Sequence, residues 1–262
     1  MNLMQDILVL FSGGKDSFLT ACREIHEHDH VTLISFNNSA VLGEKNFLHG
    51  ATRLINRWGN NRVKYAGVYN TGAVIQNLIA YWKKTPQREI ANAYPDLTGA
   101  QVTCLHCQTA MWICAIAYAK AHSIQTIASG YRKSDPFCTG DPGYIERIRS
   151  IATTHKIAIK LPAWDDESWS GPAGDFNRDT ELYRNKFLPA VYEPKCMLGW
   201  PVADLNPDEK ACMHQYFDKI LSHKIDTEIL RMTEVFSTLD LGPVSIDILD
   251  YPIPDPREDG LY

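Results

Sequence analysis

The strongest constraint on the fold is a series of short, mostly apolar runs that alternate with segments of helical periodicity. The strand-like runs are Ile7–Phe11, Val31–Phe36, Val63–Val68, Ile124–Ala128 and Ile157–Leu161. The helix-like segments are roughly Phe18–His26, Glu44–Trp58, Thr71–Lys84, Leu105–Ala121 and Gly143–Thr154. Short apolar runs are typical of strands that are buried on both faces. Their alternation with helices predicts an α/β fold: a doubly wound, parallel sheet with helices on both faces.

The chain has 262 residues, enough for one large domain with a small appendage. We expect a nucleotide-binding domain over residues 1–162 and a mostly helical C-terminal extension over residues 163–262 that packs on the same domain. In the extension, Trp164–Gly174 reads as a loop, Arg178–Lys186 and Pro207–Ser222 read as helices, and an extended tail starts at Leu239. Within the first domain, Thr85–Gly99 has no clear period and reads as a loop.

Charge and composition narrow the range of partners. The formal net charge of -5 argues against a broad, non-specific nucleic-acid surface, so tRNA as a partner has no support from net charge. Neither a signal peptide nor a run of eighteen apolar residues is present, and seven cysteines are an odd number for a disulfide framework. We therefore expect a cytoplasmic protein without a membrane partner; a homodimer is compatible with the sequence.

The segment Ser12-Gly13-Gly14-Lys15-Asp16-Ser17 follows the first buried run directly, and a helix begins there. Glycines at this junction let backbone N–H groups approach an anion, and the helix N-terminus adds its positive end. Lys15 supplies a mobile positive charge, the two serines supply hydroxyl donors, and Asp16 could hold Mg²⁺ or cap the helix. The alternative, a Gly-Gly turn with an Asp cap, is common after a strand. The spacing differs from that of a Walker A loop.

This segment resembles the signature of the PP-loop ATP pyrophosphatases, and the order of elements over about residues 6–161 agrees with that family. The resemblance implies that ATP is cleaved between its α and β phosphates, that AMP is transferred to a substrate oxygen, and that a nucleophile then displaces AMP. It also implies which residues lie beside ATP. They are Ser12, Gly13, Gly14, Lys15, Asp16, Ser17, Ser35, Phe36, Asn37, Ser129 and Gly130.

A second polar group follows the fourth strand-like run. Arg132, Lys133 and Asp135 come soon after a strand end, so they are directed toward the same site and could stabilise charge on the transferring phosphoryl group. The alternative is a solvated loop. Together with Lys15 and Asp16, these three residues are the catalytic candidates.

Three cysteines form the candidate metal site. Cys104 and Cys107 are three residues apart at the start of the predicted Leu105–Ala121 helix, where a helix N-terminus favours the thiolate, and Cys196 follows much later. Such a trio suits an iron–sulfur cluster with one open iron site, or a zinc ion with a fourth ligand. Buried, inert thiols and a catalytic persulfide and disulfide pair are the alternatives. The candidate fourth ligands are His106, Cys138 and Cys212, whereas Cys22 and Cys114 read as core.

The cysteine pattern is similar to that of the cluster-dependent tRNA 2-thiolation enzymes. The resemblance implies a [4Fe–4S] cluster on Cys104, Cys107 and Cys196 that takes up sulfur. One departure is Ser129–Asp135, where those enzymes carry a Gly-His-x-x-Asp-Asp-like stretch. The segment Ser129–Glu146 is instead loosely similar to the 7-cyano-7-deazaguanine synthases, which insert nitrogen from ammonia.

Three functions follow as hypotheses. The first is an ATP-dependent enzyme that adenylates a nucleobase, nucleoside or other small molecule and inserts sulfur from a sulfur donor. The second adenylates a deazapurine carboxylate for nitrogen insertion, with zinc or no metal. The third is a nucleotide-binding sensor or partner subunit with the same fold.

Overall fold

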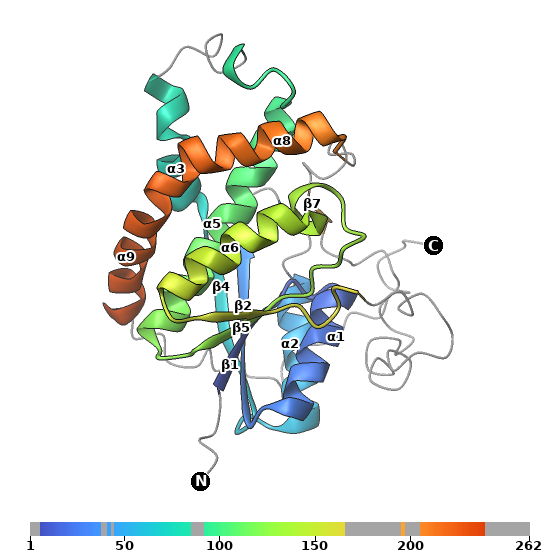
Figure 1. The fold of residues 1–262 in the computed structure, drawn as a ribbon. Coiled ribbons are helices and arrows are strands. Elements are labelled where there is room, and N and C mark those ends of the chain that lie inside the picture. The colour runs from blue at the N-terminus through green and yellow to red at the C-terminus, as the bar shows by residue number, and fades with distance from the viewer. Residues whose placement is uncertain are drawn as a thin grey trace, which may run out of the picture.

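A computed structural model of the protein describes residues 6–37, 41–42, 45–84, 92–165, 195–196 and 205–238. Its centre is a five-stranded parallel sheet in the order β4-β2-β1-β5-β6 (Figure 1). The strands are β1 (Asp6–Leu10), β2 (His30–Asn37), β4 (Val63–Asn70), β5 (Thr126–Ala128) and β6 (Ala158–Lys160). The doubly wound α/β fold predicted from the alternating pattern is therefore confirmed.

Helices cover both faces of this sheet (Figure 1). The helices α1 (Lys15–Glu27) and α2 (Lys45–Trp58) lie on one face, and three others lie on the opposite face. Those three are α3 (Gly72–Lys84), α5 (Gly99–Ala121) and α6 (Pro142–Thr154). A short 3₁₀ helix, η1 (Phe137–Gly140), precedes α6. A separate antiparallel pair joins β3 (Val41–Leu42) to β7 (Lys195–Cys196).

The first strand shows why this pattern needs two hydrophobic layers. Successive side chains of a strand point to opposite faces. Ile7 and Val9 pack in the layer beneath α1 and α2, whereas Leu8 and Leu10 pack in the layer beneath α5. All four are buried, as the continuous apolar run predicts for a central strand.

The helix α5 corrects one prediction from the sequence. It begins at Gly99, six residues before the predicted start at Leu105, because Thr98 and Gln101 form a capping box. Cys104 and Cys107 are thus the sixth and ninth residues of the helix, beyond the reach of its N-terminal dipole. By length and composition α5 could cross a membrane, but 78% of its most apolar window is buried inside the protein, as in a core helix.

The C-terminal helices pack on α5. The sequence predicted one helix over Pro207–Ser222; the structure has α8 (Pro207–Tyr216), a π-helical turn (Phe217–Leu221) and α9 (Ser222–Thr238). Residues of α8 and α9 belong to the same hydrophobic cluster as α5. The division of the chain at residue 162 stays a prediction.

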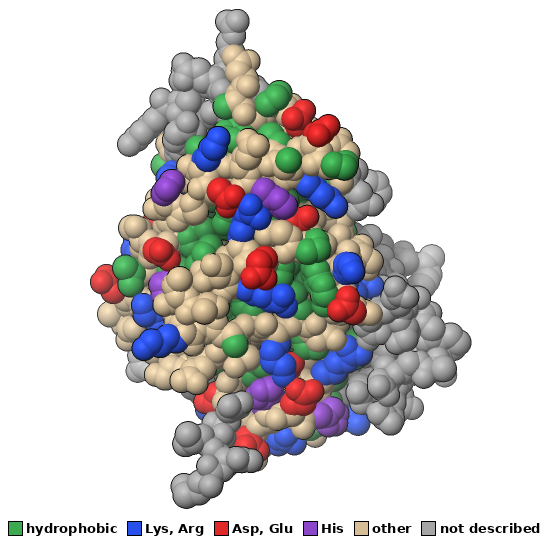
Figure 2. Space-filling view, viewed as in Figure 1, with side chains coloured by type: hydrophobic (Ala, Val, Ile, Leu, Met, Phe, Trp, Pro, Cys, Tyr) green, Lys and Arg blue, Asp and Glu red, His purple; other side chains and the backbone are tan. Residues whose placement is uncertain are grey.

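Several predicted segments lie outside the described residues: the Arg178–Lys186 helix, the tail from Leu239, the Trp164–Gly174 loop beyond Asp165, and the Thr85–Gly99 loop before Asn92. On the face shown in Figure 2, positive and negative side chains are interspersed. That face therefore carries no extended basic patch among the described residues.

Candidate active site

The Ser12–Ser17 loop lies at the carboxyl edge of the sheet, where the strand order reverses. Strand β1 pairs with β2 on one side and with β5 on the other, and the connections from these two neighbours run on opposite faces. Loops that follow β1 and β5 therefore diverge at this point and leave a crevice between them. Ser12 follows β1 and Ser129 follows β5, so both predicted ATP-binding segments border this crevice.

Hydrogen bonds within the loop hold its two serines together. The Ser17 hydroxyl donates to the Gly14 carbonyl at 2.9 Å and lies 3.1 Å from the Ser12 hydroxyl. The Ser12 backbone N–H also donates to Ser17 Oγ, at 3.2 Å. The N-cap of α1 is Gly14, which makes no side-chain cap. These bonds join the two ends of the loop, and no side chain of the N-cap residue covers the positive end of α1, which leaves that end open to an anion.

Two glycines make this geometry accessible. Gly13 has φ +71°, a left-handed conformation that glycine adopts at little cost. Gly130, just after β5, lies against the start of α1: a Cβ there would come within 2.7 Å of the Asp16 carbonyl carbon and 2.8 Å of the Ser17 nitrogen. Any side chain at residue 130 would therefore push the β5 loop away from the Ser12–Ser17 loop.

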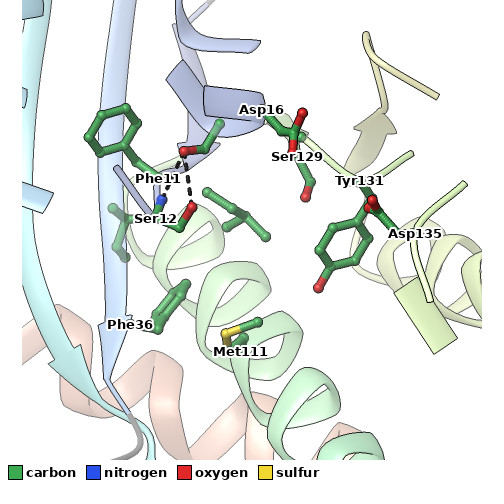
Figure 3. Close-up of a pocket in the computed structure, with 12 residues that line it drawn as sticks. Phe11, Ser12, Asp16, Phe36, Met111, Ser129, Tyr131 and Asp135 are labelled. Atoms are coloured by element: carbon green, nitrogen blue, oxygen red, sulfur yellow. Dashed lines mark hydrogen bonds between the residues drawn. The ribbon is translucent and has the colours of Figure 1, made fainter. Parts of the chain in front are cut away.

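A cavity of about 200 Å³ opens between the two loops (Figure 3). Its polar rim is formed by Ser12, Asp16, Ser129 and Asp135, while its floor is apolar. The other lining residues are Leu10, Phe11, Ser17, Ile34, Phe36, Met111, Gly130 and Tyr131. A polar rim beside the phosphate loop and an apolar floor suit a ligand with a charged end and a planar, apolar end.

Arg132 is not among the residues that line the cavity, but it pairs with two that are, Asp16 and Asp135. Its Nε lies 3.4 Å from Asp16 Oδ1 and 3.5 Å from Asp135 Oδ1, and its backbone N–H donates to Asp135 Oδ2 at 2.7 Å. Burial raises the pKa of Asp135, although its bonds to Arg132 act in the opposite direction. Arg132, a cation that the sequence analysis had selected, thus lies between Asp16 of the Ser12–Ser17 loop and Asp135 of the segment after β5.

Some of the other residues that the sequence analysis selected line the cavity, and others do not. Phe36, Ser129 and Gly130 line the cavity, whereas Ser35, Asn37 and Lys133 are absent from its lining. Ser35 is buried and donates to the Phe11 carbonyl at 2.5 Å, which supports the strand end. The exposed Lys133 bonds through its backbone N–H to the Trp164 carbonyl. The side chains of Lys15 and Cys196 lie outside the described part of the structure.

The sequence analysis did not select three residues that lie near the cavity. Tyr131 lines it and donates its hydroxyl to Gln108 Oε1 on α5, and Met111, one turn further along α5, lies on the floor. Tyr131 directly follows the predicted Ser129-Gly130 pair, so its position after a strand end was a usable signal. Gln108 and Met111 had no such signal in the sequence, because only tertiary packing brings α5 under the cavity.

The thiols of Cys104 and Cys138 are hydrogen-bonded to each other. This bond lowers the pKa of Cys104, whereas burial raises the pKa of Cys138. Cys107 is buried one turn further along α5, and its charge contributes to raising the pKa of both Cys138 and Tyr131. The Cys104–Cys138 pair thus joins α5 to η1, and Cys107 lies one turn further along α5.

The other candidate metal ligands, His106 and Cys212, make contacts with other parts of the protein. His106 Nε2 lies 3.0 Å from the Tyr216 hydroxyl on α8, and Cys212 interacts with the backbone near Asp96. Cys22 and Cys114 are fully buried among apolar residues, as predicted for core thiols. Within the described residues, Glu24, Glu27 and His28 have ligand atoms within 4.8 Å of one another, but Lys160 already bonds both glutamates.

No protein-family model matches the chain, and no curated protein matches it in sequence. Among solved structures, it is similar to a 4-thiouridine synthetase in complex with RNA and bound ATP, with a TM-score of 0.55 and 11% identity. The match covers 88% of this chain and 53% of the synthetase, so the chain spans about half the length of that protein. The likeness shows a shared fold, and it agrees with the doubly wound α/β fold expected from the sequence.

Two further structures are similar at lower TM-scores. A predicted subunit of tRNA methyltransferase from Methanocaldococcus jannaschii has a TM-score of 0.39 and 18% identity, covering 68% of this chain and 76% of that one. NMN synthetase from Francisella tularensis has a TM-score of 0.42 and 14% identity, covering 93% and 90%. Both TM-scores are below 0.5, so neither likeness bears on the fold.

Proposed function

We propose that this chain, which has the fold of the PP-loop ATP pyrophosphatases, adenylates an oxygen of a nucleobase or nucleoside and replaces it with sulfur. The observation that carries the proposal is the Ser12–Ser17 loop at the start of α1, opening on a cavity at the switch point of the sheet. The ATP bound to the 4-thiouridine synthetase of similar fold supports ATP as the ligand.

In the first half-reaction the loop holds the departing pyrophosphate. The substrate oxygen attacks the α-phosphorus, a new P–O bond forms, and the bond from that phosphorus to the oxygen bridging it to the β-phosphorus breaks. The N-terminus of α1, the loop N–H groups and the Lys15 charge stabilise the pyrophosphate as it leaves. Asp16, whose side chain is 29% exposed on the cavity rim, would hold Mg²⁺ through its carboxylate.

Arg132 is the second source of positive charge. Its guanidinium is attached to the β5 side of the cavity and reaches Asp16 on the loop side. A cation there stabilises charge that develops on the α-phosphoryl oxygens. Asp135 orients Arg132 through the backbone bond and the side-chain pair and is therefore a positioning residue.

In the second half-reaction a sulfide-level donor adds to the activated carbon. A C–S bond forms, the C–O bond breaks, and AMP leaves with the original oxygen, so the carbon is neither oxidised nor reduced. Cys104, Cys107 and Cys196 would hold a [4Fe–4S] cluster or zinc, because thiolates are the preferred donors for both. When bound, such a cluster supplies an iron position open to a sulfur ligand. The hydrogen-bonded thiol at Cys104 fits this donor set.

The position of Cys104 on α5 supports the link to sulfur. Cys104, Gln108 and Met111 share one face of α5, at spacings of four and three residues. Met111 lies on the cavity floor, and Cys104 is about 10 Å from it along the helix axis, given the rise per residue of an α-helix. A metal at Cys104 would therefore lie on the same face of α5 as the cavity floor, about 10 Å from Met111 along the helix.

The test is pyrophosphate release from ATP in the presence of nucleoside, deazapurine and total-tRNA pools. We expect wild-type protein to release pyrophosphate and AMP, and Lys15→Ala to lower the rate roughly a hundredfold, as loss of a transition-state cation does. Lys120→Ala is the matched control, because Lys120 is an exposed lysine at the far end of α5.

Two results contradict the proposal. The first is that none of the substrate pools makes the wild-type protein release more pyrophosphate than Lys15→Ala does. In that case only the third hypothesis, a nucleotide-binding sensor, would remain. Incorporation of ammonia nitrogen instead of sulfur, by protein without an iron–sulfur absorbance, would favour the deazapurine reaction.

A further inference from the structure

Helix α6 makes a histidine–aspartate contact with the C-terminal helices at each of its two ends. At its N-terminus, Nε2 of His214 on α8 lies 2.6 Å from Oδ1 of Asp141, the N-cap residue of α6. At its C-terminus, Nε2 of His155, the C-cap residue, lies 3.1 Å from Oδ1 of Asp226 on α9. A carboxylate oxygen only accepts hydrogen bonds, so the histidine donates in both contacts. The two contacts are thus of the same chemical kind, at opposite ends of one helix.

The contact at the N-terminus of α6 is the more deeply buried one. The Asp141 side chain is 4% exposed, whereas that of Asp226 is 69% exposed. Asp141 Oδ1 also accepts the Tyr144 backbone N–H at 2.7 Å, so one oxygen caps α6 and binds His214. Gly143 lets the imidazole approach this closely, because a Cβ there would lie 2.7 Å from His214 Nε2. Loss of a partner costs a buried carboxylate more than an exposed one, so His214 helps to hold Asp141 in place.

Asp141 ends the segment that brings Arg132 to the candidate active site. This 132–141 segment is folded on itself, since the Asp135 N–H donates to the Arg132 carbonyl at 2.9 Å. Gly140 packs on the same turn so closely that a Cβ would lie 2.9 Å from the Asp135 carbonyl carbon. Because Gly140 is bonded to Asp141 and touches this backbone, a shift of Asp141 is passed on to Asp135 and to the Arg132 that it pairs with.

We propose that His214 is a positioning residue of the candidate active site. Through Asp141 it holds the 132–141 segment where Arg132 pairs with Asp16 of the Ser12–Ser17 loop. The inference rests on the proposed function in one respect, that Arg132 acts on bound ATP. It gives α8, a C-terminal helix, a part in the site that the loops after β1 and β5 form.

Amide hydrogen exchange of the full chain without nucleotide, measured by NMR, tests the positioning directly. We expect His214→Ala to raise the exchange rates of the Arg132 and Asp135 amides about threefold to tenfold, because both are hydrogen-bonded inside the segment. His214→Gln should restore slow exchange, because the glutamine amide nitrogen can donate from the place of Nε2. His155→Ala is the matched control, since it removes the same kind of contact at the other end of α6.

A second variant keeps a polar side chain on α8. His214→Asn places its amide short of Asp141 and should therefore behave as His214→Ala does, with a smaller change in volume. Fast exchange in both of these variants, and slow exchange in His214→Gln, supports the inference.

Binding of a fluorescent ATP analogue measures the functional consequence. His214→Ala should weaken binding about threefold to tenfold, whereas His214→Gln and His155→Ala should stay within about twofold of wild type. In an Arg132→Ala background, His214→Ala should have no further effect, because His214 acts through Arg132. A general loss of stability would instead weaken binding in His155→Ala too, and it would persist without the Arg132 side chain.

Wild-type exchange of the Arg132 and Asp135 amides in His214→Ala overturns the inference. So does a loss of ATP affinity in His214→Ala that is equally large with and without the Arg132 side chain.

The two proposals fail separately. A chain whose Arg132 and Asp135 amides exchange faster in His214→Ala, but which never releases pyrophosphate, contradicts the proposed function alone. A chain that releases pyrophosphate, but whose amide exchange is unchanged in His214→Ala, contradicts only this inference.

Discussion

Single residues at the carboxyl edge of the sheet set how closely the two halves of the cavity approach. The Ser12–Ser17 loop and the segment after β5 touch through Gly130, with the Asp16 backbone as the neighbour. Backbone atoms cannot move aside as the end of a long side chain can. The separation between the loop that would hold phosphate and the segment that carries Arg132 is therefore fixed by the absence of one methyl group.

The first prediction concerns Gly130→Ala. The added Cβ, 2.7 Å from the Asp16 carbonyl carbon, should displace the loop and weaken ATP binding at least about tenfold, since a misplacement of about 1 Å in a binding site can cost this much or more. Titration with a fluorescent ATP analogue measures the effect. Gly99→Ala is the control, because a Cβ at Gly99 meets no atom within 4 Å. Equal ATP affinity in the two variants would contradict the role given to Gly130.

The second prediction concerns pH. Burial raises the pKa of Asp135, so this carboxylate becomes protonated at a higher pH than an ordinary aspartate. Protonation weakens its hold on Arg132, and ATP affinity should therefore fall as pH decreases through a range above that of an exposed aspartate. In Asp135→Asn this acidic limb should disappear, with the affinity at neutral pH already reduced. An unchanged limb in Asp135→Asn would assign it to another group.

At the scale of elements, the start of α5 determines where the thiols lie. The capping box of Thr98 and Gln101 consists of two reciprocal bonds, at 3.2 Å and 2.7 Å, and it adds a turn and a half before the predicted start. This turn moves Cys104 and Cys107 away from the helix end. The hydrogen bond to Cys138, and not the helix dipole, is therefore the main cause of the lowered pKa of Cys104.

The third prediction tests this cap. Thr98→Ala should lower the free energy of unfolding by about 1 kcal/mol, the usual cost of removing an N-cap side chain. Thr103→Ala is the control: Thr103 Oγ1 bonds back to the Gly99 carbonyl within the helix, so its loss should change stability by less than about 0.5 kcal/mol. Urea unfolding followed by circular dichroism gives both values. A neutral Thr98→Ala would mean that the first turn of α5 adds nothing to stability.

The capping box was also the readable signal that the sequence-based prediction of α5 missed. Thr98-Gly-Ala-Gln101 has the spacing of such a box, but Gly99 and the unpatterned residues before it favoured a loop. In contrast, the five strands and the other helices of the sheet were predicted to within a few residues, because a buried strand and an amphipathic helix each leave a local pattern.

At the scale of the whole molecule, the C-terminal helices complete the core. Phe236 of α9 is buried, and its ring is 5.0 Å from that of Tyr69 on β4 and 5.4 Å from that of Tyr118 on α5. Residues more than a hundred positions apart thus share one hydrophobic cluster. Strand β4 and helix α5 therefore pack against a residue that lies beyond the predicted first domain.

The fourth prediction follows from this packing. Phe236→Ala should lower the free energy of unfolding by about 3–5 kcal/mol, as truncation of a buried aromatic ring does. Leu230→Ala on the same helix should change it by less than about 0.5 kcal/mol, because Leu230 is 53% exposed. Denaturant unfolding monitored by tryptophan fluorescence compares them. Similar small losses in both variants would show that α9 is not part of the cooperative core.

The amino-acid sequence by itself determined the parallel sheet, the Ser12–Ser17 loop and its place at a strand end. These features depend on neighbours along the chain: burial of a strand on both faces, and a glycine-rich turn into a helix. Tertiary structure alone decided that Gly130 touches Asp16, that Met111 and Tyr131 meet at the cavity, and that Cys138 joins Cys104. Such contacts join residues on different elements, and their distances follow from how helices and strands pack, which no local pattern records.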